Sequence, residues 1–267
     1  MKELSLQELR IIEFEILKMF RDFCNENGIR YFLSNGTLLG AVKYKGFIPW
    51  DDDVDVFVPR ADYDKMLRLF KDNEKYKLFA FERNSTYRYP FAKLCDITTR
   101  KVEGSYDNGV TLGVDIDIFP LDAWSNNINV AKKEVKRIKT NMFFLSMAKL
   151  GNAKSSNVVK RIVKSVIMIG CKMFGSKFFV KRMIKLSRSK GDDGQKYVGC
   201  KSWCIYGTRE IIPAEVFAGT VDVEFEGEIF PAPVGYDKYL RSLYGDYRKD
   251  PPLEKQKTHH YFTAYRI

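Results

Sequence analysis

The spacing of apolar residues predicts alternating helices and strands in the first 122 residues. From Ser5 to about Asn25, apolar side chains recur every three or four positions behind the capping-box pattern "SLQE", which predicts a helix. "TLLGAVKY", after the turn "NGT", predicts one or two helical turns, and Asp62 is expected to cap a helix over "YDKMLRLFKD". Short apolar runs predict strands at 29–34, 51–58, 76–82, 91–97 and 113–122. This order predicts a domain in which helices flank a sheet.

The middle of the chain, from about Asn129 to Lys190, changes to a basic amphipathic pattern. Three stretches there have a helical period and few acidic residues, at 130–150, 158–174 and 177–190. An aromatic-rich segment that is irregular or strand-like follows. These shifts predict a core in 1–125, a basic helical subdomain in 126–192 and a C-terminal segment in 193–267 that packs back on the core.

Composition narrows the class of protein. With 45% hydrophobic and 30% charged residues the chain is globular, and its net charge of +11 suggests an anionic partner. It carries no recognisable RNA or DNA module, so no nucleic-acid partner is expected. No apolar run approaches the ~20 residues of a membrane span, and the N-terminus does not resemble a secretion signal. We therefore expect a cytoplasmic location. Five scattered cysteines fit a reducing compartment and packing roles.

Candidate chemistry is concentrated in "GFIPWDDDVDVFVP" (46–59). If 51–58 is a strand, Asp51, Asp53 and Asp55 share one face, while Asp52 points away with the valines. Three carboxylates in a row would repel one another unless a cation holds them, and oxygen ligands suit Mg²⁺ or Mn²⁺. A calcium loop is disfavoured because Val56 occupies the position at which that loop needs glycine.

A second acidic strand, "VDIDIFPLD", places Asp115 and Asp117 on one face. Alongside the first strand, one of them would complete a cluster of three or four carboxylates. A lone Asp-x-Asp pair is common by chance. Two such strands, with a Gly-Thr turn upstream of the first, are a stronger signal for a metal site.

Four motifs together resemble the LicD family of phosphotransferases, which is related to the fukutin group and the nucleotidyltransferase-fold superfamily: "SNGTLLGAVKYKGFIPWDDDVDV", "FAKLCDITTR", "VDIDIFPLD" and "FEGEIFPAPVGYDKYLRSLYGDYRKDPP". The resemblance implies an α+β fold with a nucleotidyltransferase-like mixed sheet. It implies transfer of phosphorylcholine from CDP-choline to a sugar hydroxyl of a teichoic acid or lipopolysaccharide precursor on a polyprenyl carrier. Transfer of another phosphoalditol from a CDP donor, or glycosyl transfer from a nucleotide-sugar, remain alternatives.

The resemblance also implies roles for individual residues. It assigns Asp53, Asp55 and Asp117 to catalysis and metal binding. Asp51 matches a further acidic position, and the four aspartates together are expected to hold one or two Mg²⁺ or Mn²⁺ ions. Asp117 is also a candidate base for the acceptor proton. Asp115 is interpreted as a bystander.

Substrate contacts are expected from a second group of residues. Gly36 and Thr37 match a phosphate-binding turn. Lys45 and Lys93 are expected near the phosphates, with Lys93 the stronger candidate. Trp50 is a candidate for an aromatic cage around a quaternary ammonium group, as are Trp203 and Tyr206.

The basic segment at 129–190 has two interpretations. It could bind an anionic membrane surface and hold the protein at the inner face of the cell membrane. Alternatively, it forms an ordinary helical subdomain with a lysine-rich, solvated face.

Overall fold

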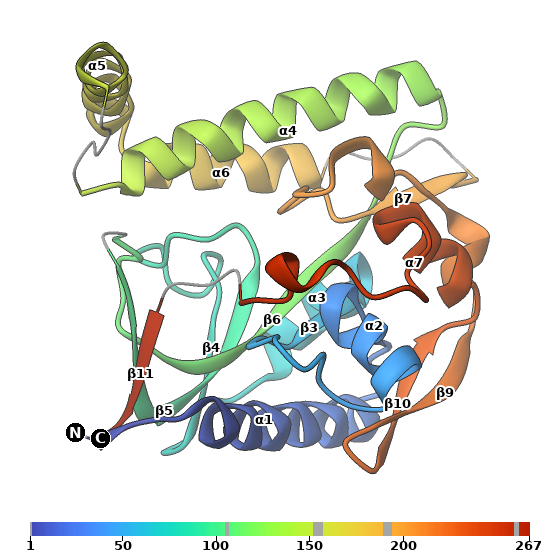
Figure 1. Cartoon of the computed structure of the whole chain (residues 1–267). Coiled ribbons are helices and arrows are strands. Elements are labelled where there is room, and N and C mark those ends of the chain that lie inside the picture. The colour runs from blue at the N-terminus through green and yellow to red at the C-terminus, as the bar shows by residue number, and fades with distance from the viewer. Residues whose placement is uncertain (1, 105–106, 152–156, 189–193, 259–261) are drawn as a thin grey trace.

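A mixed β-sheet lies at the centre of the computed structural model, which describes residues 2–104, 107–151, 157–188, 194–258 and 262–267 (Figure 1). Its strands follow the order β1-β11-β5-β6-β3-β2, while β4 pairs with β5, β7 with β6, and β8 with β7. β3 runs parallel to β6, and the other pairs are antiparallel. The strands are β1 Lys2–Glu3, β2 Phe32–Leu33, β3 Asp55–Pro59, β4 Tyr76–Phe79, β5 Ala92–Glu103, β6 Leu112–Ala123, β7 Tyr197–Gly199, β8 Ile212–Pro213 and β11 Phe262–Arg266, with a separate hairpin of β9 Thr220–Phe225 and β10 Glu228–Pro233.

Helices lie on opposite sides of this sheet (Figure 1). α1 packs against β5 and β6, whereas α4 and α6 pack on each other in a layer on the far side of the sheet from α1. The helices are α1 Leu6–Glu26, α2 Asn35–Tyr44, α3 Arg60–Leu69, α4 Ile128–Lys149, α5 Val158–Phe174, α6 Ser176–Ser187 and α7 Tyr236–Tyr244. The mixed sheet and its helices confirm the predicted α+β fold.

The first helix follows its sequence pattern closely. The Ser5 hydroxyl accepts a hydrogen bond from the Glu8 amide at 3.2 Å, and the Glu8 carboxylate accepts one from the Ser5 amide at 2.9 Å. This capping box satisfies amides that the first turn leaves without helical partners. Apolar residues three and four positions apart then reach the core, where Ile16 and Phe20 are fully buried.

Three local predictions are corrected by the structure. The strand predicted at 51–58 begins only at Asp55, because the residues before it form a loop. Asp62 lies in the first turn of α3, whose cap position is held by Pro59, so Asp62 is not the cap. The C-terminal segment contains helix α7, which was not predicted although its tyrosines and leucines recur at helical spacing.

The basic middle segment forms α4, α5 and α6, as the helical period predicts. α5 packs beside one end of α4 and is seen nearly end-on in Figure 1. The boundary predicted at residue 192, and the last two residues of the predicted stretch 177–190, lie outside the described residues. Among the helices that the structure describes, none combines the length and apolar character needed to cross a bilayer.

The C-terminal segment returns to the central sheet at several places. β7 pairs with β6 through Asp122 and Gly199, and β11 pairs with β5. α7 buries Tyr239 and Leu240 in the same core cluster as α1 and the central strands. Segments far apart in the sequence therefore meet around the ends of β3 and β6.

Candidate active site

Three acidic side chains converge in the loop that precedes β3. Asp51, Asp52 and Asp53 each offer a carboxylate oxygen, and these three oxygens lie within 4.8 Å of one another. The expectation that Asp52 points away from this cluster is wrong. Strand alternation does not apply there, because the chain becomes a strand only at Asp55.

Two further carboxylates join from the paired strands. Asp55 begins β3 and stands opposite Asp117 of β6 in the parallel register. Burial and the nearby charges of Asp53 and Asp117 raise the pKa of Asp55 well above its ordinary value. Burial also raises the pKa of Asp117, to about 6, although Lys93 opposes this shift. The protein therefore concentrates acidic groups whose shared negative charge is costly without a cation.

Lys93 of β5 supplies one positive charge to this cluster. It stands opposite Asp117 in the antiparallel register, and its ammonium group forms a short ion pair with the Asp117 carboxylate. The same group lies 3.3 Å from the Asp115 carboxylate, which also pairs with Lys101. Asp115 is thus held between two lysines, whereas Asp117 remains about a fifth exposed.

Asn35 orients Asp55, and sequence reasoning missed this role. The Asn35 amide donates to the Asp55 carboxylate at 3.1 Å and accepts from the Tyr239 hydroxyl of α7 at 2.8 Å. Asn35 has a φ of 45°, a left-handed conformation that asparagine tolerates better than most residues. The "NG" pair was a usable signal for this conformation, but the contact with Tyr239 spans 204 positions.

Gly36 and Thr37, predicted in a turn before the helix, lie instead in the first turn of α2 and approach the acidic residues from that side. A Cβ placed on Gly36 would lie 2.6 Å from the Asp51 carboxylate, so only glycine permits this close approach. The Thr37 hydroxyl is buried and accepts a hydrogen bond from the Asp55 amide at 2.8 Å. Gly36 borders the pocket described below, while the hydroxyl of Thr37 positions the start of β3.

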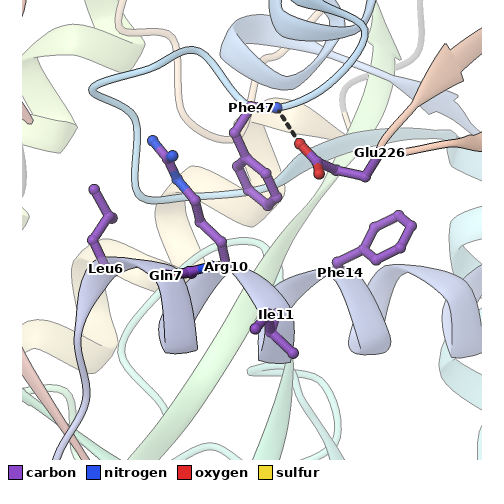
Figure 2. Close-up of a pocket in the computed structure, with 7 residues that line it drawn as sticks. All are labelled: Leu6, Gln7, Arg10, Ile11, Phe14, Phe47 and Glu226. Atoms are coloured by element: carbon purple, nitrogen blue, oxygen red, sulfur yellow. Dashed lines mark hydrogen bonds between the residues drawn. The ribbon is translucent and has the colours of Figure 1, made fainter.

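Arg10 of α1 holds the acidic loop from behind. Its guanidinium donates to the backbone carbonyls of Ile48 at 2.8 Å, Pro49 at 2.9 Å and Asp51 at 2.7 Å. Figure 2 shows Arg10 rising from α1 beside the Phe47 ring, whose centroid is 5.2 Å away. Sequence reasoning missed Arg10 because it lies about 40 positions before the loop, in an ordinary amphipathic helix.

The β9–β10 turn braces the same loop from its other end. The Glu226 carboxylate accepts a hydrogen bond from the Phe47 amide at 3.0 Å (Figure 2). Glu226 and Gly227 both have positive φ angles, 52° and 77°, which is the pattern of a tight hairpin turn. A Cβ on Gly46 would lie 2.1 Å from the Glu226 carboxylate, so the turn and the loop are in close contact.

A pocket of about 810 Å³ opens in front of the acidic residues. Asp51, Asp53 and Asp55 lie on its wall together with residues of α2, α7 and the C-terminal segment. The aromatic residues that border the pocket are Tyr44, Trp50, Tyr206, Tyr244 and Tyr247. The lysines that border it are Lys43, Lys249, Lys255 and Lys257. It therefore combines carboxylates, aromatic faces and cations in one space.

The aromatic residues of the pocket form two contacting pairs. The Trp50 ring lies edge-on to Tyr44, with centroids 6.3 Å apart, and Tyr206 lies edge-on to Tyr244 at 5.4 Å. The hydroxyls of Tyr206 and Tyr244 are 2.9 Å apart. Trp203 has another location, since it packs against Tyr89 and Phe91 and is absent from the described pocket wall.

The two lysines expected near phosphates have different surroundings. Lys93 lies within the carboxylate cluster, as described above. Lys45 is exposed and pairs with Glu224 of β9 at 2.9 Å, and it is not among the described residues that border the pocket. Lys43 does border the pocket and pairs with Asp250 at 2.6 Å.

Comparisons with known proteins match this chain to one family. The family model described as "LicD/FKTN/FKRP, nucleotidyltransferase domain" matches residues 28–153. The chain is 32% identical to the lipopolysaccharide cholinephosphotransferase LicD of Haemophilus influenzae (strain ATCC 51907 / DSM 11121 / KW20 / Rd), over 99% of both chains.

Two shorter matches are to uncharacterised proteins. One, from Rickettsia typhi (strain ATCC VR-144 / Wilmington), is 36% identical over 22% of this chain and 20% of its own length. The other, from Rickettsia prowazekii (strain Madrid E), is 39% identical over 18% of each chain.

Proposed function

The chain belongs to the LicD family, and from this premise we propose that it transfers phosphorylcholine from CDP-choline to a sugar hydroxyl of a cell-surface glycan precursor. One observation carries the proposal. The carboxylates of Asp53 and Asp55 border a pocket with aromatic and cationic walls, and Asp117 is paired with Asp55 directly beside it. A polyprenyl-linked acceptor of lipopolysaccharide or teichoic acid type would bring this reaction to the inner face of the cell membrane.

The acidic cluster fits a divalent metal. Asp51, Asp52 and Asp53 already place three oxygens within 4.8 Å, and hard oxygen donors are the ligands that Mg²⁺ and Mn²⁺ prefer. Asp55 and Asp117 are the further candidate ligands, since burial and neighbouring carboxylates raise their pKa values and a bound cation would offset that cost. When bound, such a metal would neutralise charge on the donor phosphates and lower the pKa of the acceptor hydroxyl.

The protein's own residues would supply positioning and proton transfer. In the proposed step the acceptor oxygen bonds to the phosphorus that carries choline, the bond from that phosphorus to the bridging oxygen breaks, and CMP departs with that oxygen. Asp117 is partly exposed and has a pKa near 6, so it can take the acceptor proton near neutral pH. Before the proton transfer, Lys93 balances the charge of the ionised Asp117 carboxylate.

The pocket walls support a choline-bearing nucleotide. A volume of about 810 Å³ lies in the range of cofactor and substrate sites. Trp50, Tyr44, Tyr206 and Tyr244 border the pocket, and a quaternary ammonium held over the face of such a ring gains about 0.5–2 kcal/mol per contact. Positive charge for the phosphates would come from lysines that border the pocket, among them Lys43, which pairs with Asp250, and Lys249, which pairs with Asp246.

The donor test compares nucleotides that differ in one feature. The purified protein is incubated with Mg²⁺, a lipid-linked glycan and either CDP-choline, CDP-ribitol, CDP-glycerol or a UDP-sugar, and released CMP or UDP is measured together with the mass of the glycan. Among these nucleotides, we expect only CDP-choline to give CMP release and addition of phosphorylcholine to the glycan. Preferential use of CDP-ribitol or CDP-glycerol would assign another phosphoalditol, and release of UDP with sugar transfer would assign a glycosyltransferase.

A further inference from the structure

Helix α5 turns an apolar face outward. Among the described side chains of this helix, six large apolar ones are between 58% and 84% exposed: Val159, Ile162, Val166, Ile169, Met173 and Phe174. They recur at intervals of one, three or four positions, so they form one stripe along the helix, which we call the α5 stripe. Contiguous apolar surface of this kind marks an interaction site.

The other side of α5 attaches the helix to the rest of the molecule. Cys171 is 6% exposed and belongs to a core cluster that also contains Leu145 of α4 and Phe179 of α6. Ile167 packs against the same cluster. The described core therefore packs against the inward side of α5 and leaves the α5 stripe exposed.

The charge around the stripe favours an anionic partner. Residues 135–191 contain fifteen Lys and Arg and no Asp or Glu. At about 100° per residue, Arg161 and Lys172 lie together beyond one edge of the α5 stripe, and both are exposed, as is Lys160 in the first turn of the helix. Exposed basic side chains beside an apolar face are typical of helices that lie in a membrane surface, where the charged ends reach the headgroups.

A second copy of this chain fits the stripe less well. A symmetric contact through α5 would bring the basic flanks of two copies together, with no acidic residue in either helix to offset them. An anionic bilayer instead offers an apolar interior to the stripe and phosphate groups to the lysines and arginines.

We propose that α5 is a membrane-binding helix, whose stripe inserts into the surface of an anionic bilayer while the flanking cations contact the headgroups. This inference does not depend on the proposed transfer reaction. It corresponds to the first of the two interpretations of the basic segment, and the vesicle experiment tests it against the second.

Vesicle flotation of the full chain tests the proposal. Neutral phosphatidylcholine vesicles are compared with vesicles that contain 30% phosphatidylglycerol. We expect the wild type to bind the anionic vesicles. The double variant Val166→Asp/Ile169→Asp should bind them at least ~10-fold more weakly than the wild type. The double variant Lys160→Gln/Arg161→Gln should bind them about 25-fold more weakly, because each lost charge is worth roughly fivefold in affinity. The matched control Ile229→Asp changes an exposed apolar residue of β10 and should bind like the wild type.

Three further measurements make the outcome decisive. Thermal unfolding shows whether each variant is folded, and nucleotide release with a water-soluble acceptor should be unchanged in Val166→Asp/Ile169→Asp. Equal binding of the wild type to neutral and anionic vesicles, or unchanged binding of the stripe variant, would overturn the proposal. So would a wild-type dimer in sedimentation analysis that the stripe variant abolishes, because the stripe would then be covered by a second copy.

Discussion

The contact between Gly36 and Asp51 allows the acidic cluster to be disturbed without changing any acidic residue. In Gly36→Ala the new methyl group would lie 2.6 Å from the Asp51 carboxylate oxygen, well inside ordinary contact distance. The next neighbours are farther, with the Asp51 carboxyl carbon at 3.7 Å and an Ile48 methyl group at 3.9 Å. The end of the Asp51 side chain must therefore move, while the backbone can stay in place.

The expected effects on folding and on metal binding have different sizes. Alanine favours a helix over glycine by up to about 1 kcal/mol, and a displaced side-chain end costs little, so the unfolding free energy should change by less than about 1 kcal/mol. Groups that orient a metal ligand typically change affinity by about 10- to 100-fold when they are altered. We expect a loss of that size in Mg²⁺ affinity and in kcat/KM.

The assay pairs Mg²⁺ titration of CMP release with urea unfolding. The matched control is Gly170→Ala, which also replaces a helical glycine but has no atom within 4 Å of its new Cβ. Gly170→Ala should gain up to about 1 kcal/mol of stability and keep the wild-type Mg²⁺ dependence with a water-soluble acceptor. The reasoning is refuted if Gly36→Ala is folded and its Mg²⁺ dependence matches that of the wild type.

Two other substitutions test parts of the site, and a third tests Glu210, a buried carboxyl group that is not among the described residues bordering the pocket. Arg10→Met removes the hydrogen bonds to the loop carbonyls, so urea unfolding should show a loss of about 1.5–3 kcal/mol and Mg²⁺ titration a weaker affinity; wild-type values in both would argue against a positioning role. Asn35→Gly keeps the left-handed backbone but removes a hydrogen-bond donor that lowers the pKa of Asp55. Because Asp55 then holds its proton more readily, Mg²⁺ affinity should fall more at pH 6 than at pH 8. An equal loss of affinity at both pH values would contradict this. Burial raises the pKa of Glu210 to about 8 from a usual value near 4.5. Between these two pH values the folded protein keeps a proton that the unfolded chain has lost. The Glu210 carboxyl therefore makes the unfolding free energy fall by about 1.4 kcal/mol per pH unit as the pH rises through this range. Glu210→Gln should remove this slope in urea unfolding at pH 5, 6.5 and 8, and a slope like that of the wild type would show that Glu210 does not titrate there.

The alternation of acidic and apolar residues predicted that the two acidic strands would bring carboxylates together, whereas the choice of Asp117 over Asp115 came from the family resemblance. The orientation of Asp52 was not predictable from the sequence. Its face depended on where the strand begins, and the loop is shaped by contacts from Arg10 and Glu226 that are distant in the chain. Strand ends are set by such tertiary contacts more than by local pattern.

Helices show the same division between local pattern and tertiary structure. The period of α5 predicted an amphipathic helix, but period alone does not say whether the apolar side faces the core or the solvent. Tyr239 could be assigned to packing from its spacing, yet its hydroxyl also holds Asn35 from 204 positions away. Roles that depend on such long-range contacts needed the structure.

The metal dependence of CMP release from CDP-choline bears most directly on the carboxylate cluster. After EDTA treatment we expect release to stop and to return with Mg²⁺ or Mn²⁺. We also expect Asp53→Asn to need at least tenfold more metal, while Asp222→Asn, an exposed aspartate of β9, behaves like the wild type. Continued transfer of phosphorylcholine in EDTA, or an Asp53→Asn variant with wild-type metal dependence, would contradict the account.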